Sequence, residues 1–103
     1  MIGVSITLKI KNEEKEKKFL EVFQKALESI HLIEGLKEFQ ASKVIGKPLT
    51  YHIFSLWERE EDIEKWLSNP YYKDYIRKGG EKLFESFTSF RWKPIKEPKI
   101  IKY

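Results

Sequence analysis

Two histidines are the side chains of this sequence best suited to acid–base chemistry, because only histidine titrates near neutral pH without help from its surroundings. His52 lies in a segment, 51–57, whose bulky residues indicate a strand. We therefore take His52 as the candidate catalytic residue. The competing interpretation is a hydrogen-bonded histidine in the core or at a subunit interface.

The other histidine and the remaining polar residues form no second catalytic or metal-binding pattern. His31 follows the first predicted helix, where a cation interacts favourably with the helix dipole, so it is interpreted as a capping residue. The two histidines are far apart, and the chain has no cysteine. No side-chain metal site and no thiolate nucleophile are therefore expected. The sequence also lacks the nucleophile elbow of hydrolases and a phosphate-binding glycine loop.

Four aromatic residues are candidates for the wall of a ligand pocket, namely Trp57, Trp66, Tyr72 and Tyr75. Pockets for small molecules are mostly apolar and aromatic, with a few polar groups that orient the ligand. These four are therefore the predicted substrate-binding residues. Aromatic residues at strand and helix spacing more often belong to an ordinary hydrophobic core.

The elements that must position these residues follow from the hydrophobic periodicity. Residues 2–10 alternate strictly between apolar and small or polar side chains, which predicts a strand. Asn12, followed by two glutamates, predicts the start of a helix that ends at Ile30. The other predicted elements are an edge strand with a bulge at 36–45, a central strand at 51–57, a helix at 58–67 with a second helical piece from Pro70, and a last strand at 87–92.

The order of these elements predicts the fold class. Strand, helix, strand, strand, helix, strand is the split pattern of ferredoxin-like α+β domains. Right-handed crossovers would place both helices on one face of a four-stranded antiparallel sheet. The expected organisation is one ferredoxin-like domain at residues 1–93 and an extended or loosely docked C-terminal tail at 94–103.

The face of the sheet without helices predicts a homodimer. The central strand has large side chains on both faces, and the last strand carries Phe87 on one face and Phe90 and Trp92 on the other. Exposing these aromatic residues would leave an apolar patch larger than soluble monomers usually carry. Packing of two identical sheets would cover it through a self-complementary interface.

Composition narrows the partners and the compartment. The net charge is +4, but lysine and glutamate alternate closely, which is typical of solvated helix faces and does not favour nucleic acid as a partner. The polar residues within 2–10 make this segment neither a signal peptide nor a membrane span, so a cytoplasmic protein without a membrane partner is expected. The cysteine-free, lysine- and glutamate-rich composition is typical of thermostable proteins.

Three stretches together resemble the antibiotic biosynthesis monooxygenase (ABM) domain family. They are EGL at 34–36, similar to the family's turn after the first helix, FSLWE at 54–58, a strand that ends in tryptophan before an acidic residue, and DIEKWLSNPYYKDY at 62–75, similar to the family's interrupted helix. The resemblance spans residues 2–92. It implies a dimeric α/β barrel.

The same resemblance allows haem degradation to be considered. Haem-degrading members hold an asparagine in the first strand, and a tryptophan and an iron-binding histidine in the second helical region. Trp66 matches the tryptophan, but Val4 and Ile76 stand at the other two positions and supply neither an amide nor an iron ligand. Orthodox haem degradation is therefore not expected.

The family resemblance implies a monooxygenase that acts on a small hydrophobic or aromatic substrate and that uses no cofactor. Such an enzyme needs an electron-rich phenol or quinol, held in a water-poor pocket and deprotonated there. Two alternatives stay open. The chain could be a non-catalytic dimeric module that binds a ligand or is mainly structural, or a haem-binding or haem-degrading protein with a non-standard iron ligand.

Overall fold

The computed structural model describes residues 1–30, 33–68, 70, 73 and 80–95. The elements are β1 (Ile2–Ile10), α1 (Glu13–Ile30), β2 (Leu36–Lys43), β3 (Thr50–Trp57), α2 (Glu60–Leu67), α3 (Gly80–Leu83) and β4 (Phe84–Trp92). The predicted α+β order is therefore confirmed, with the short helix α3 added before the last strand.

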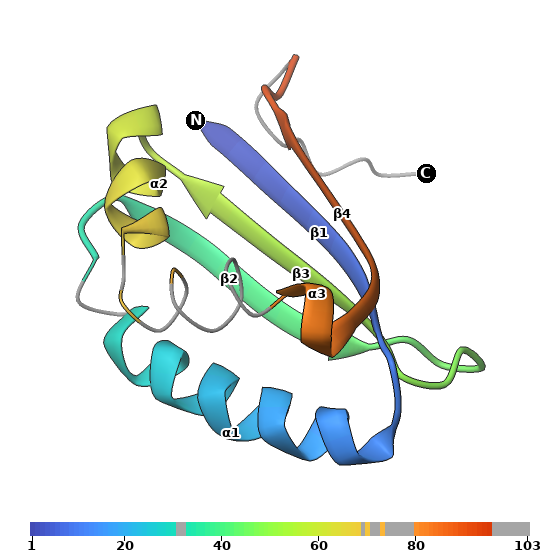
Figure 1. Cartoon of the computed structure of the whole chain (residues 1–103). Coiled ribbons are helices and arrows are strands. Elements are labelled where there is room, and N and C mark those ends of the chain that lie inside the picture. The colour runs from blue at the N-terminus through green and yellow to red at the C-terminus, as the bar shows by residue number, and fades with distance from the viewer. Residues whose placement is uncertain (31–32, 69, 71–72, 74–79, 96–103) are drawn as a thin grey trace.

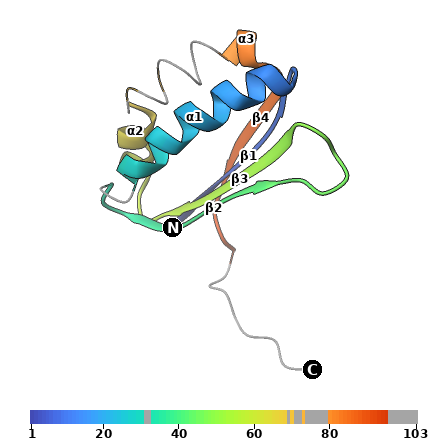
Figure 2. The ribbon, with the colours of Figure 1, turned by 90° about the horizontal axis from the view of Figure 1, so that it is seen from below.

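The four strands form one antiparallel sheet in the order β2-β3-β1-β4. Figure 1 shows the sheet with β2 at one edge and β4 at the other, and Figure 2 shows α1, α2 and α3 on the same face of the sheet. As predicted, β3 is an internal strand and β2 is an edge strand with a register shift between Leu36 and Glu38. The opposite face of the sheet carries no described helix.

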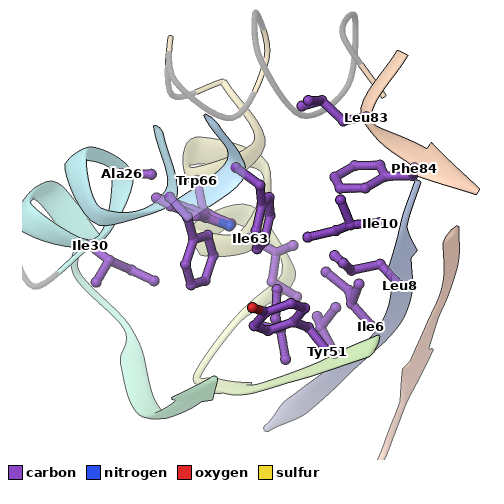
Figure 3. Close-up of a cluster of buried hydrophobic side chains, with 14 of the residues drawn as sticks. Ile6, Leu8, Ile10, Ala26, Ile30, Tyr51, Ile63, Trp66, Leu83 and Phe84 are labelled. Carbon is purple, nitrogen blue, oxygen red and sulfur yellow. The ribbon is translucent and has the colours of Figure 1, made fainter. Parts of the chain in front are cut away.

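The hydrophobic core lies between the helices and the sheet because each element presents one apolar face. Figure 3 shows Leu8 and Ile10 of β1 together with Phe84 of β4 and Trp66 of α2 in this cluster. The start of α1 is fixed as predicted, because the backbone amide of Lys15 donates to Asn12 Oδ1 at 2.8 Å. Alternation and capping thus account for the first half of the fold.

The last strand begins earlier than the sequence predicts, at Phe84 and not at residue 87. A register shift between Lys9 and Ile10 pairs Ile10 with Phe84 and Leu8 with Phe87. Both phenylalanines therefore face the helices, and their rings stack with centroids 5.6 Å apart. The bulge interrupts the period of two, which is why the sequence around residues 82–86 has no clear periodicity.

Helix α2 also begins later than predicted, at Glu60 and not at residue 58. Arg59 has an extended backbone and precedes the helix, while the amide of Glu58 donates to the carbonyl of Gly35 at 2.7 Å. Glu58 is therefore used to join the end of β3 to the turn before β2. In the described part of the chain, no helix is long and apolar enough to cross a membrane.

A polar cluster ties α1 to the sheet beside the core. The hydroxyl of Tyr51 donates to Glu16 Oε2 at 2.8 Å, and Lys43 Nζ donates to the same oxygen at 3.0 Å. Burial, and then the hydrogen bond to Glu16, raise the pKa of Tyr51 to about 12. The hydrogen bonds from Tyr51 and Lys43 lower the pKa of the Glu16 carboxyl.

This cluster predicts that Tyr51→Phe lowers the free energy of unfolding by about 1–2 kcal/mol at pH 8, since it removes a hydrogen bond to a charged acceptor. The pKa of Tyr51 is higher in the folded state than in the unfolded state. Its contribution to the free energy of unfolding is therefore complete below the unfolded-state pKa of about 10 and is lost as the pH rises through about 12. Urea unfolding at pH 8 and pH 11.5 should therefore show a smaller cost of the substitution at the higher pH. Lys43→Met serves as the control, because it leaves the tyrosine in place. An equal cost of Tyr51→Phe at both pH values would contradict the assignment.

Candidate functional site

A cavity of about 120 Å³ lies between the sheet and the helices. Its floor is the helix-facing side of β1, with Val4, Ile6 and Leu8, and further walls come from β2, β3, β4, α1 and α2. Most of the described side chains that line it are apolar. The cavity therefore has the character of a small-molecule pocket, with few groups that can orient a ligand.

Two of the four predicted substrate-binding residues meet at this cavity. Trp57 at the end of β3 is 1% exposed, and Trp66 of α2 is also buried. Figure 3 shows Trp66 beside Ile63 on the helix that covers the sheet. Tyr72 and Tyr75, the other two predicted residues, lie outside the described residues, as does the predicted capping residue His31.

The polar groups among the described lining residues are Ser55, Ser89 and Arg91. Ser55 Oγ accepts a hydrogen bond from Trp57 Nε1 at 2.8 Å, and both side chains are buried. In the sheet, Val4 lies between Ser55 on β3 and Arg91 on β4. A ligand on the floor of the cavity would therefore lie between Ser55 on one side and Arg91 on the other.

Arg91 links the last strand to α2 at this cavity. Its Nη1 lies 3.3 Å from Glu60 Oε1 and its Nη2 lies 3.0 Å from Glu64 Oε1. Both carboxylates are exposed, so each bridge contributes on the order of 0.2–1 kcal/mol. The bridges hold the guanidinium in place more than they stabilise the fold.

His52, the predicted catalytic residue, lies on the other face of the sheet. It is half-buried and lies opposite Thr7 of β1 and Ser42 of β2. Because side chains alternate along a strand, it points away from the face that carries its neighbours Tyr51 and Ile53. It is not among the described residues that line the cavity. Its acid–base role stays a prediction, and its position on the helix-free face favours the alternative of an interface histidine.

Sequence reasoning missed Ser55 and Arg91 as pocket residues. A signal was present for Ser55, because it has the same strand parity as Ile53 and Trp57, both of which face the helices. Arg91 likewise has the parity of Phe87. The cross-strand register that places the two residues on either side of Val4 is not visible in the sequence.

The described residues that line the cavity include no side chain that binds haem iron. Val4 lines the cavity without an amide, and Ile76 lies outside the described residues. In the described part of the chain, no three His, Cys, Asp or Glu side chains gather into a metal site. A cavity of about 120 Å³ is also well below the roughly 300–1,000 Å³ of sites that hold larger ligands.

The fold closely matches several solved structures. A crystal structure of an antibiotic biosynthesis monooxygenase aligns with a TM-score of 0.79 at 10% identity, covering 93% of this chain and 100% of that chain. A candidate antibiotic biosynthesis monooxygenase from Deinococcus radiodurans gives a TM-score of 0.80 at 14% identity, with 99% and 100% coverage. A conserved protein from Methanosarcina mazei Go1 gives 0.76 at 15% identity, with 88% and 89% coverage. At these identities the likeness shows a shared fold.

The sequence comparison identifies the family. None of the curated proteins compared with this chain matches it. Residues 1–78 match the family described as antibiotic biosynthesis monooxygenase, which is most of the chain and includes β1 to α2. The ferredoxin-like sheet, the aromatic cavity and this match agree, and the chain belongs to the antibiotic biosynthesis monooxygenase family.

Proposed function

We propose that this protein is a monooxygenase that acts on a small aromatic substrate bound in the cavity between helices and sheet, without a metal held by its side chains. The observation that carries the proposal is the apolar cavity of about 120 Å³ beside Trp57 and Trp66. Family membership supports the same reaction class. The substrate would be an electron-rich phenol or quinol, because such a ring can itself reduce dioxygen.

The reaction balances without an external reductant. A quinol and one dioxygen molecule give a hydroxyquinone and one water, so that the ring loses four electrons and one oxygen atom enters the product. The protein would bind the ring against apolar walls, exclude bulk water and favour the ionised substrate. The group that would favour the ionised form of a phenol is Arg91, once the ligand's oxygen competes with Glu60 and Glu64 for its guanidinium.

The test is dioxygen uptake in the presence of 1,4-hydroquinone and methylhydroquinone, compared with buffer alone. Monooxygenation should consume one dioxygen per quinol, and later addition of catalase should return no oxygen. An oxidase would release hydrogen peroxide, and catalase would then return half of the oxygen consumed. Ligand binding without faster uptake would favour the non-catalytic alternative.

Trp66→Phe should lower kcat/KM by roughly tenfold if the indole contacts the substrate, since this is the effect of losing about 1.4 kcal/mol in the transition state. Ile45→Ala is the matched control, because Ile45 is 98% exposed in the β2–β3 turn and far from the cavity lining. Circular dichroism checks that both variants are folded. Unchanged kinetics in Trp66→Phe would remove this residue from the site.

His52→Asn tests the other predicted residue, and full turnover in that variant would dismiss its catalytic role.

The proposed functional unit is a homodimer formed through the helix-free face of the sheet. Phe90 on this face is 58% exposed, and the ring of Trp92 stacks on Phe54 with centroids 5.7 Å apart. Trp92 Nε1 also donates to Ser5 Oγ at 3.1 Å, and the indole lies over Gly3, where any Cβ would overlap it. Trp92 is thus laid flat against the sheet, which leaves an aromatic surface suited to a second copy.

A further inference from the structure

The hydroxyl of Ser55 has an unused hydrogen-bond donor inside an apolar cavity. A serine hydroxyl has one donor and two acceptor positions. Trp57 Nε1 occupies one acceptor position at 2.8 Å, and within the described part of the chain Ser55 Oγ has no other hydrogen-bond partner. Ser55 is only 7% exposed and lines the cavity. A buried donor without an acceptor is costly, so its natural partner is an oxygen atom of the ligand.

The bond from Trp57 also restricts the direction of this donor. Because the indole N–H can only donate, the hydroxyl of Ser55 must accept from it, and its own hydrogen is directed elsewhere. Trp57 is almost completely buried at the end of β3, so the pair is held by the core and does not depend on the ligand. The donor therefore has fewer directions open to it before a ligand binds, which reduces the entropy cost of binding.

The size of the cavity limits the ligand. An apolar cavity of about 150 Å³ is large enough to bind benzene, whereas this one measures about 120 Å³. A single six-membered ring therefore fills it after a small adjustment, and two fused rings would require its walls to separate. The floor under such a ring is Val4, which pairs with Ser55 in the sheet, and the next residue on the same face, Ile6.

We propose that Ser55 is a ligand-binding residue. Its hydroxyl, which accepts a hydrogen bond from Trp57, donates one to the hydroxyl oxygen of a phenol or quinol that has a single ring. This assignment rests on the proposed function, in that it takes the same cavity as the substrate site. The substrate class is then a phenol or quinol with one ring, and its oxygen substituent has Ser55 as its hydrogen-bond partner. Ser55 selects for the oxygen, and the cavity volume selects for one ring.

The experiment compares phenol with toluene, which has nearly the same shape but no oxygen. Binding is followed by the indole N–H signal of Trp57 in nitrogen–proton correlation spectra, assigned by its loss in Trp57→Phe. In Ser55→Ala the affinity for phenol relative to toluene should fall by roughly three- to tenfold, the worth of one hydrogen bond. The affinity for toluene should change by less than about twofold, since the substitution leaves the apolar walls in place. Ser55→Cys, which keeps the shape of the side chain at a slightly larger volume and is a weaker donor, should give an intermediate fall and replaces the alanine variant if that variant does not fold.

The outcomes separate this inference from the proposed function. If both compounds bind and the preference for phenol is the same in the wild type, Ser55→Ala and Ser55→Cys, the proposed role of Ser55 is wrong while the cavity remains a ligand site. If phenol binds as predicted but no quinol is turned over, only the monooxygenase proposal is lost. If neither compound binds, the cavity is not a ligand site and both fail. A final comparison uses 1-naphthol, which should bind at least about tenfold more weakly than phenol, and tighter binding of the larger ring would overturn the single-ring assignment.

Discussion

Gly35→Ala should lower the free energy of unfolding by roughly 3 kcal/mol or more, the largest effect on stability that we expect from a single methyl group in this protein. Gly35 has a φ of 90°, a conformation that side chains with a Cβ rarely adopt. A Cβ at this position would also overlap the carboxylate of Asp62. The two effects add, since one is backbone strain and the other is a steric clash.

Asp62 has little freedom to move away from such a clash. Its side chain is 0% exposed and lies in the first turn of α2, where Arg59 Nε approaches Oδ2 to 3.5 Å and Lys65 Nζ approaches Oδ1 to 4.0 Å. The carbonyl of Gly35 also accepts the amide of Glu58 at 2.7 Å. The turn after α1 and the start of α2 are therefore held together at this glycine.

Gly46→Ala is the matched control for this prediction. Gly46 has a similar φ of 80°, but no atom lies within 4 Å of the position of its Cβ. This variant should lose only the backbone contribution, roughly 1 kcal/mol. Urea unfolding of both variants, with equal slopes, would give the two costs directly. Equal costs would show that the contact between Gly35 and Asp62 does not constrain the fold.

Phe90→Glu should convert the proposed homodimer into a monomer at micromolar concentration. Phe90 is highly exposed in the single chain, so the substitution should cost the isolated subunit little stability. In a dimer packed through the helix-free face, two carboxylates would be buried in an aromatic interface, and an unpaired buried charge is strongly unfavourable. Light scattering of the wild type and the variant at the same micromolar concentration measures the change in mass.

Ile45→Glu is the control for the dimer prediction. Ile45 is even more exposed than Phe90 but lies in the turn between β2 and β3, which projects beyond the sheet in Figure 1. The wild type and this variant should both have the mass of a dimer. A monomeric wild type would remove the proposal, and a dimeric Phe90→Glu would place the interface on a different surface.

The local pattern of the sequence was sufficient to predict most of the helices and strands. The alternation at β1, the cap at Asn12 and the helical spacing in α1 depend only on neighbouring residues, and each has the expected position in the structure. The same holds for the placement of Trp57 and Trp66 at one cavity, because each is on the apolar side of its own element. Period and capping are local properties, so the sequence alone determines them.

Residues that depend on contacts between elements were decided by the tertiary structure. Asp62 belongs to a run of charged residues that reads as a solvated helix face, yet it is completely buried against the turn at Gly35. The bulge opposite Ile10 shifted the start of β4, because an extra residue in one strand has no local signature. The positions of Ser55 and Arg91 on either side of Val4 likewise arise from the register of three strands that are far apart in sequence. The register of the strands and the docking of the helices are set by the packing of the whole core. The sequence alone therefore determined the sheet and its apolar faces. Only the tertiary structure brought together the polar groups of the site.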